Sequence, residues 1–249
     1  MAGYHNNTAR IWTLENRACK IISARSGSIL SIALLPKKFI ALGCINGSVE
    51  IWKIQKNGAK LMETIVGHRY AVKSLGFVQL AGKRLVIASE DASLKYLDVS
   101  PLLDTKKNLA KHRQMAEGKP LVQCIMRLTG NKVCIYPSHI LPLLIAETII
   151  QECITSLAVS PNSKWVVAGS DDHCIQFYDS EAATLHSVIR GHDDAVTSVD
   201  LCQRGNILVT GGKDGKARMW NVFYILFRSL MLPNLPFYIR GLSVMPQLN

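Results

Sequence analysis

The sequence predicts an all-β fold assembled from copies of one sheet module. Short apolar runs alternate with polar residues at a period of two, turn residues separate the runs, and the whole pattern recurs along the chain. Four segments share one layout of three apolar runs joined by two polar turns. These segments are Ile21–Ile54, Thr64–Val99, Thr148–Ser180 and Val188–Val222.

The residue that ends each third run sets the length of the module. Trp12 and Trp52 are 40 positions apart, and Tyr178 and Trp220 are 42 positions apart. A repeat of about 40–45 residues, with Gly-His near its start and Trp-Asp at its end, is typical of a four-stranded propeller blade. Leu97 ends the second copy and lies 81 positions before Tyr178, close to two periods. The gap therefore leaves room for one degenerate copy.

Two segments carry the pattern most fully and closely resemble WD repeats. One runs from Gly67-His68 to Leu97-Asp98, and the other runs from Gly191-His192 to Trp220-Asn221. With the other copies in register, the resemblance covers most of residues 2–99 and 145–222. It implies a WD-repeat β-propeller, which we expect to be incomplete, with four recognisable blades, one partial blade and one degenerate blade.

The pattern divides the chain into four parts. Residues 1–99 and 145–222 are expected to form WD-repeat blades, and the first part opens on the later half of a blade. Residues 100–144 are expected to be a basic linker followed by an insertion or a degenerate blade. Residues 223–249 form a non-repeat apolar tail, in which Phe223–Phe227 is expected to add an outer strand.

The resemblance also implies a buried hydrogen-bond chain within each blade. In WD repeats it joins the Gly-His histidine, a Ser or Thr of the second strand, the turn Asp and the terminal Trp. The last repeat has all four, as His192, Thr210, Asp214 and Trp220. A buried carboxylate needs such hydrogen-bond donors.

The other copies keep fewer of these residues. The copy at 64–99 keeps His68 and Asp91, and the copy at 148–180 keeps Asp172. We expect blades with an incomplete chain to rely more on apolar packing and to be less rigid.

Residues that resemble an enzyme site are better explained by the repeat. His192, Thr210 and Asp214 are the residue types of a hydrolytic triad, but the same positions recur as structure in other copies. His68 and His192 lie in different blades without a Cys/His cluster, so they do not predict a metal site. The sequence has no phosphate-binding Gly-rich loop and no nucleophile elbow. We expect a protein that is not an enzyme, with no cofactor, metal or small-molecule substrate.

The turns at one face of the predicted propeller are the candidate partner-binding residues, because loops of a rigid scaffold carry its contacts. Tyr70 is favoured among them, because exposed aromatic side chains often anchor interfaces. The candidates are Arg69, Tyr70, Glu90, Asp171, Asp193, Asp194 and Lys213.

Charge favours acidic partners. The chain has 29 Lys and Arg against 18 Asp and Glu, for a net charge of +11. Asp104–Lys119 concentrates five basic residues and is either a solvated linker or a basic contact arm. That charged linker followed by Ile154–Ser163 resembles the WD proteins of the small-subunit processome, which act with U3 small nucleolar RNA.

This resemblance implies a non-catalytic scaffold that assembles proteins within a ribosome-biogenesis ribonucleoprotein. Two alternatives remain open: an RNA-contacting subunit that uses a basic face, and a substrate adaptor of a ubiquitin ligase or a signalling complex. Salt dependence of binding would distinguish the RNA-contacting subunit from the scaffold.

The sequence favours an intracellular location. The N-terminus has no signal-peptide pattern, and the longest uncharged apolar stretch, Val133–Ala146, is 14 residues long and contains two prolines. The seven cysteines lack any Cys-x-x-Cys pair, as expected for free thiols in a reducing compartment. We expect a nucleolar or nuclear protein, with the cytoplasm as the alternative and no membrane partner.

Overall fold

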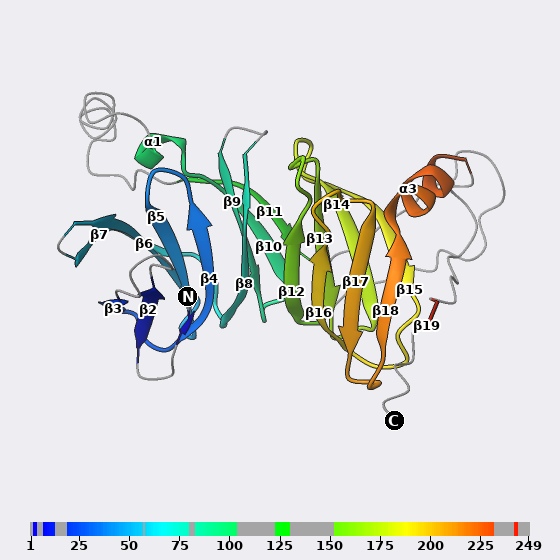
Figure 1. Ribbon diagram of the computed structural model, residues 1–249, viewed down its shortest axis with the longest axis horizontal. Helices are drawn as coiled ribbons and strands as arrows, with labels where there is room; N and C mark the ends of the chain where they lie inside the picture. Colours follow the sequence, from blue (N-terminus) through cyan, green and yellow to red (C-terminus); the bar gives the residue numbers. More distant parts are fainter. Residues whose placement is uncertain are drawn as a thin grey trace. The chain divides into compact units, whose positions relative to one another are not determined.

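The computed structural model is built almost entirely from antiparallel sheets of consecutive strands, which confirms the all-β prediction (Figure 1). The chain divides into two compact units, Met1–Arg127 and Leu128–Asn249. The structure describes residues 2–3, 7–12, 19–56, 58–79, 83–103, 123–129, 152–231 and 242–243.

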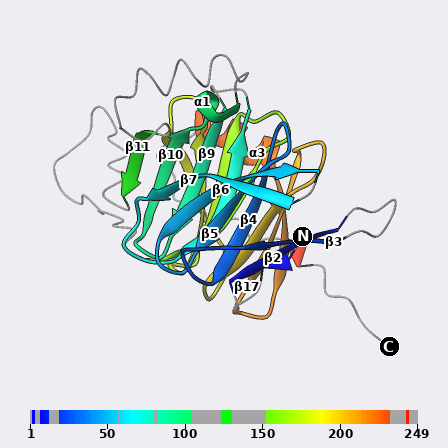
Figure 2. The ribbon, with the colours of Figure 1, turned by 90° about the vertical axis from the view of Figure 1, so that its left-hand side faces the viewer.

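The first unit holds a three-stranded sheet and two four-stranded sheets, with the strands of each lying side by side (Figure 2). The first sheet is β1 (Ala2–Gly3), β2 (Thr8–Trp12) and β3 (Cys19–Ser23). The second is β4 (Ile29–Leu35), β5 (Phe39–Cys44), β6 (Ser48–Gln55) and β7 (Gly58–Val66). The third is β8 (Val72–Val78), β9 (Arg84–Ser89), β10 (Ser93–Asp98) and β11 (Gln123–Thr129), with the short helix α1 (Ser100–Leu103) after β10.

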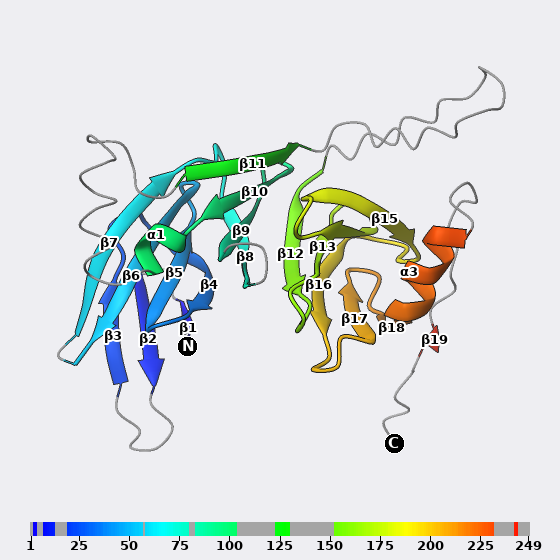
Figure 3. The ribbon, with the colours of Figure 1, turned by 90° about the horizontal axis from the view of Figure 1, so that it is seen from above.

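The second unit holds two four-stranded sheets and one longer helix. Its first sheet is β12 (Ile154–Val159), β13 (Trp165–Ser170), β14 (Cys174–Asp179) and β15 (Thr184–Arg190). Its second sheet is β16 (Val196–Leu201), β17 (Ile207–Gly212), β18 (Ala217–Asn221) and β19 (Leu242–Ser243). Helix α3 (Val222–Met231) follows β18 directly and lies against β15 and β18 (Figure 3).

The four-stranded sheets repeat in register as well as in strand order. Each first strand carries an irregularity of one residue in its pairing with the second strand, and such a bulge increases the local twist of the strand. The bulges fall between Ile29 and Ser31, Val72 and Ser74, Ile154 and Ser156, and Val196 and Ser198.

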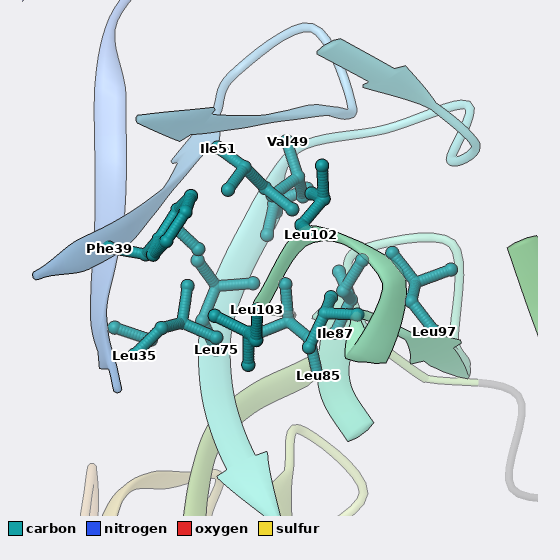
Figure 4. Close-up of a cluster of buried hydrophobic side chains, with 14 residues drawn as sticks. Leu35, Phe39, Val49, Ile51, Leu75, Leu85, Ile87, Leu97, Leu102 and Leu103 are labelled. Atoms are coloured by element: carbon teal, nitrogen blue, oxygen red, sulfur yellow. The ribbon is translucent and has the colours of Figure 1, made fainter. Parts of the chain in front are cut away.

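Neighbouring sheets within a unit pack through a valine against a glycine. A Cβ added at Gly43 would lie 2.5 Å from Cγ1 of Val72, and one added at Gly169 would lie 2.8 Å from Cγ1 of Val196. Glycine at these two positions therefore lets the next sheet approach closely. The apolar core between β4–β7 and β8–β10 is completed by leucines of α1, whose side chains point into the same cluster (Figure 4).

The expected outer strand at Phe223–Phe227 is wrong, because these residues belong to helix α3. Val222 and Ile225, three positions apart, are buried in the core of the second unit, which is the spacing of one helix face. The run is apolar at consecutive positions, a pattern that fits a strand and a helix alike, so the sequence did not separate the two. β19 is the fourth strand instead. In the part of the chain that the structure describes, no helix is long and apolar enough to cross a membrane.

Part of the segment 100–144 joins the preceding sheet. β11 pairs beside β10 and completes the sheet that begins at β8. The basic segment Asp104–Lys119 lies outside the described residues, as do residues 130–144. The boundaries of the four predicted parts stay a prediction.

Candidate functional site

The sheet β16–β19 contains a continuous chain of side-chain hydrogen bonds. The indole N–H of Trp220 donates to Oγ1 of Thr210 at 2.8 Å, and Thr210 Oγ1 lies 2.8 Å from Nε2 of His192. Nδ1 of His192 lies 3.0 Å from Oδ1 of Asp214. The carboxylate can only accept, so Nδ1–H of His192 donates to it, and Nε2, the other ring nitrogen, accepts the hydroxyl proton of Thr210. The structure thus brings together all four residues singled out in the last repeat.

Arg218 adds a fifth member to this chain, which the sequence interpretation missed. Its Nη1 lies 2.5 Å from Oδ2 of Asp214 and 2.8 Å from Nδ1 of His192. Both nitrogens carry protons that face the carboxylate, so Arg218 and His192 share Asp214 and do not bond to each other.

The carboxylate of Asp214 also holds the backbone of two loops. It accepts hydrogen bonds from the N–H groups of Asp193 and Lys216, both at 3.1 Å. Burial works to raise the pKa of Asp214, but the hydrogen bond from Arg218, the two backbone donors and His192 together hold it well below its usual range. Asp214 is therefore charged when the sheet is folded, and it ties the loop before β16 to the β17–β18 turn.

The sheet β8–β11 keeps half of this chain. Nδ1 of His68 lies 2.9 Å from Oδ2 of Asp91, which also receives the backbone N–H of Arg69 at 3.4 Å. Burial tends to raise the pKa of Asp91, but hydrogen bonds from Ser93 and His68 lower it overall. Ile87 stands where Thr210 stands in the last sheet, so the chain is not continued by a hydroxyl there.

The sheet β4–β7 makes the same connection with a different residue. Oε1 of the fully buried Glu50 accepts the backbone N–H groups of Arg25 at 2.8 Å and Ser26 at 2.7 Å. Oε2 of Glu50 accepts the indole N–H of Trp52 at 2.8 Å. One carboxylate on β6 therefore joins the loop before β4 to the terminal tryptophan. Its signal in the sequence is an acidic residue two positions before the tryptophan, in a copy whose turn holds Asn46.

The sheet β12–β15 has a third arrangement. Asp172 accepts the backbone N–H of Cys174 at 3.0 Å and so shapes the β13–β14 turn. The hydroxyl of Tyr178 donates to the amide oxygen of the buried Gln176. Gln176 occupies the position of Glu50, two residues before the terminal aromatic residue. In each of the four four-stranded sheets this position holds a buried polar or charged side chain, namely Glu50, Lys95, Gln176 or Arg218.

These arrangements suit a structural role better than chemistry. The hydroxyl of Thr210 is buried and is engaged with both Trp220 and His192, so it is not presented to a substrate. Burial, reinforced by the nearby charges of Glu50 and Asp172, raises the pKa of the Cys44 thiol to about 11 and that of Cys174 to about 12. Such thiols stay protonated and are poor nucleophiles at neutral pH. Across the described residues, no group of three His, Cys, Asp or Glu side chains is placed to hold a metal.

Four candidate partner-binding residues come together at the loop end of the second unit. Nζ of Lys213 lies 3.7 Å from Asp171, and Nε2 of His173 lies 4.0 Å from Asp194. Asp193 pairs with Lys216 at 2.6 Å. The first two pairs join the turns of two neighbouring sheets, and the third lies within the last sheet. Together they form a rim of acidic and basic side chains, which we call the charged rim. It is defined by Asp171, His173, Asp193, Asp194, Lys213 and Lys216.

The other three candidates lie in the first unit. Arg69 and Tyr70 are exposed in the loop before β8, and Glu90 forms an ion pair with Lys73 at 2.5 Å. The carbonyl of Tyr70 accepts the hydroxyl of Ser89 at 3.0 Å, which anchors the loop to the end of β9. Tyr70 therefore presents an exposed ring from an anchored backbone.

Comparison with known proteins supports the repeat assignment. The family described as "WD domain, G-beta repeat" matches residues 147–179 and 183–221, which confirms the last two of the four predicted WD repeats. The computationally designed Ika8 protein has a crystal structure that matches with a TM-score of 0.60 at 21% identity, over 88% of this chain and 54% of that chain. This likeness supports the β-propeller fold.

Three known proteins are similar to parts of this sequence. Transducin beta-like protein 3 of Mus musculus is 24% identical over 198 residues, which cover 77% of this chain and 21% of that protein. The THO complex subunit 6 homolog of Danio rerio is 29% identical over 68 residues, 27% of this chain and 21% of that protein. The serine-threonine kinase receptor-associated protein of Gallus gallus is 20% identical over 215 residues, 86% of this chain and 60% of that protein. The chain spans about a fifth of the length of the first two.

Proposed function

Because the chain carries WD repeats folded as propeller blades, we propose that it is a non-catalytic scaffold that holds other proteins together. The observation that carries this proposal is that the buried polar side chains hydrogen-bond to one another and to the backbone of nearby loops. His192, Thr210 and Asp214 make their hydrogen bonds inside the blade, where they hold the neighbouring loops in place. What remains for function is the surface of those fixed loops.

The charged rim is the proposed contact surface of the second unit. Its acids and bases alternate over two neighbouring sheets, and their ion pairs are exposed, so each pair is worth little to stability. A protein partner with charges in the opposite order would replace these pairs at small cost. Such complementarity supplies specificity and association rate more than affinity.

The setting that we propose is a ribosome-biogenesis ribonucleoprotein, in the nucleolus. The resemblance of the sequence to processome WD proteins supports it, as does the net charge of +11. Sequence similarity to Transducin beta-like protein 3 and to a THO complex subunit homolog is compatible with work inside a large assembly.

The second candidate function is direct RNA contact through a basic face, which the net charge favours. Phosphate contacts release counterions, so RNA affinity would fall steeply as salt rises. Binding between proteins through the charged rim would weaken less, because only a few exposed pairs contribute.

Affinity purification of the full chain, with and without ribonuclease and followed by mass spectrometry, tests these proposals. A scaffold retains its protein partners after ribonuclease, and nucleolar proteins recovered with U3 RNA would support the proposed setting. Loss of every partner on ribonuclease treatment would favour RNA contact. Recovery of a cullin or a G-protein complex in place of nucleolar proteins would contradict the nucleolar proposal.

The variant Asp193→Ala with Asp194→Ala removes two acids of the charged rim. We expect it to lose the retained protein partners, while Glu181→Ala with Asp200→Ala, a matched loss of two exposed acids elsewhere in the same unit, keeps them. Equal recovery by both variants would contradict the charged rim as the contact surface.

A further inference from the structure

Lysines collect at one end of the sheet β4–β7 in the first unit. Consecutive antiparallel strands place the β4–β5 turn and the β6–β7 turn at the same end of a sheet. The backbone N–H of Ile54 donates to the carbonyl of Lys38 at 2.8 Å, which ties the first turn to the end of β6. Nζ of Lys20, on β3, donates to the carbonyls of Gln55 at 2.7 Å and Lys56 at 3.1 Å in the second turn. We call this surface the lysine end, defined by Lys20, Lys37, Lys38, Lys53, Lys56 and Lys60.

No described acid pairs with these lysines. Four of the six are exposed, and Lys20 and Lys53 are half-buried. Among the described residues, none of the six forms an ion pair with a carboxylate, whereas Lys73 of the same unit pairs with Glu90. The lysine end is therefore a concentration of positive charge without counter-charges of its own in the described part of the chain.

Two of these lysines face each other across neighbouring strands. Lys53 on β6 is in register with Lys60 on β7, so the two side chains lie on the same face of the sheet. Like charges directly opposite each other destabilise a sheet. Nζ of Lys53 also lies 4.9 Å from the ring centroid of the buried Phe39, and this cation–π contact holds the ammonium in place. An anionic partner would relieve the repulsion between the two lysines.

The repeat itself does not require a lysine at this position. Lys53 comes directly after Trp52, which ends the third run of its copy. In the other three four-stranded sheets the same position holds Asp98, Asp179 or Asn221. Each accepts a backbone N–H of the segment that follows, at 2.8, 2.9 and 3.0 Å respectively. An ammonium group cannot accept a hydrogen bond. The sheet β4–β7 thus has a positive charge where its relatives have an acceptor that shapes the next turn.

We propose that the lysine end binds the phosphate backbone of RNA. This inference rests on the second candidate function, RNA contact through a basic face, and assigns that face to named residues. A lysine contacts phosphate as a point charge at the end of a flexible stem, without the planar fork of arginine. Contacts to phosphate position a protein on a nucleic acid but carry no sequence information directly. Binding at the lysine end is therefore independent of RNA sequence.

The composition of the lysine end favours RNA over a protein partner. Protein interfaces are depleted in lysine, whereas lysines that neutralise phosphates release counterions and so supply affinity for nucleic acid. The charged rim of the second unit differs, because its lysines are paired with Asp171 and Asp193. Those acids would repel a phosphate backbone. The two surfaces therefore suit different partners, a protein at the charged rim and RNA at the lysine end.

Fluorescence anisotropy of the full chain tests the proposal, with a labelled oligouridine of about 20 nucleotides as the probe. Lys53→Gln with Lys60→Gln is expected to weaken binding about tenfold near physiological salt, because two phosphate contacts are lost. The slope of log affinity against log salt is expected to become shallower by about 1.4, or about 0.7 for each lost contact. A mixed-sequence RNA of the same length is expected to give the same changes.

A matched control separates this contact from a general loss of charge. Lys164→Gln with Arg204→Gln removes two exposed positive charges from turns of the second unit, and it is expected to change RNA affinity by less than about twofold. Lys38→Gln with Lys56→Gln is a second pair of changes at the lysine end, for use if circular dichroism shows that the first variant is misfolded.

Three outcomes would overturn the proposal. RNA binding that is unchanged in folded lysine-end variants would overturn the lysine end as the site, while RNA contact by the chain would stand. An unmodified chain that does not bind RNA would overturn both this inference and the second candidate function. Polyglutamate or phosphatidylserine vesicles that bind as tightly as RNA, and lose binding in the same variants, would overturn the assignment to RNA.

Discussion

The sheets β16–β19 and β4–β7 connect the terminal tryptophan to the loop before their first strand in two different ways. In β16–β19, a chain of three side chains joins the indole of Trp220 to the loop before β16, and it ends on Asp214 in a turn. In β4–β7, Glu50 alone joins the indole of Trp52 to the loop before β4. The comparison teaches that the constant requirement is a buried acceptor for the indole and the loop N–H groups. The position that supplies it differs between copies.

The largest expected effect is that of Glu50→Ala. It leaves the indole N–H and two backbone N–H groups without their acceptor, and each unsatisfied buried group costs about 1–3 kcal/mol. We expect the free energy of unfolding to fall by about 3 kcal/mol or more, measured by chemical denaturation of the full chain. Glu90→Ala, on an exposed turn, is the control and should change it by less than about 0.5 kcal/mol. Similar losses of unfolding free energy in both variants would contradict the role of Glu50 as the buried acceptor.

Asp214→Asn is expected to cost about 2–3 kcal/mol in the same measurement, because it removes the nearest carboxylate from the buried Arg218 and leaves it only the exposed Asp193 at 3.5 Å. Adding Arg218→Met should recover part of this loss, since the buried charge is then gone. If the two changes simply add, within about 0.5 kcal/mol, then Arg218 and Asp214 are not coupled and the five-membered chain is not a unit.

The two tryptophans sharpen the comparison, because only the acceptor of the indole N–H differs. Trp52→Phe removes a hydrogen bond to a carboxylate, worth about 1.5–3 kcal/mol, whereas Trp220→Phe removes one to a hydroxyl, worth about 0.5–1.5 kcal/mol. Unfolding measurements on the two variants should therefore show the larger loss for Trp52→Phe. The reverse order would mean that the chain of β16–β19 is the stronger link.

The smallest effect appears only in acid. The pKa of Asp214 is lower in the folded chain than the value of about 3.9 expected when unfolded. Its contribution is complete above the unfolded pKa and is lost as pH falls toward the folded pKa. The difference in unfolding free energy between the unmodified chain and Asp214→Asn should therefore be constant near neutral pH and shrink below about pH 4. A difference that stays constant in acid would contradict the lowered pKa.

The repeat could be predicted from the sequence because the features that define it are local. Alternating apolar runs, turn residues and the recurring tryptophan lie within one copy, and they predicted strands such as β17 and β18. The last copy also contains all four residues of the expected hydrogen-bond chain, and the structure joins them: His192, Thr210, Asp214 and Trp220. Helix α3 was missed because an unbroken apolar run satisfies a strand and a helix equally until its packing is known.

The roles of Glu50 as an acceptor and of Arg218 as a partner of Asp214 could not be predicted from the sequence. Glu50 accepts from Arg25, 25 positions away in a loop, and no spacing rule connects the two. Arg218 lies in a strand whose alternating pattern predicts one exposed face, and its buried charge is paired with Asp214 and, at 3.5 Å, with Asp193.

The sequence by itself determined the module, its period and the residues that one complete copy would join, because the alternating runs, the turns and the recurring residues all lie within one copy. The tertiary structure alone decided which buried side chain serves as the acceptor in each sheet. Those outcomes depend on loops and sheets brought together from distant positions, and burial turns an ordinary polar residue into a required partner.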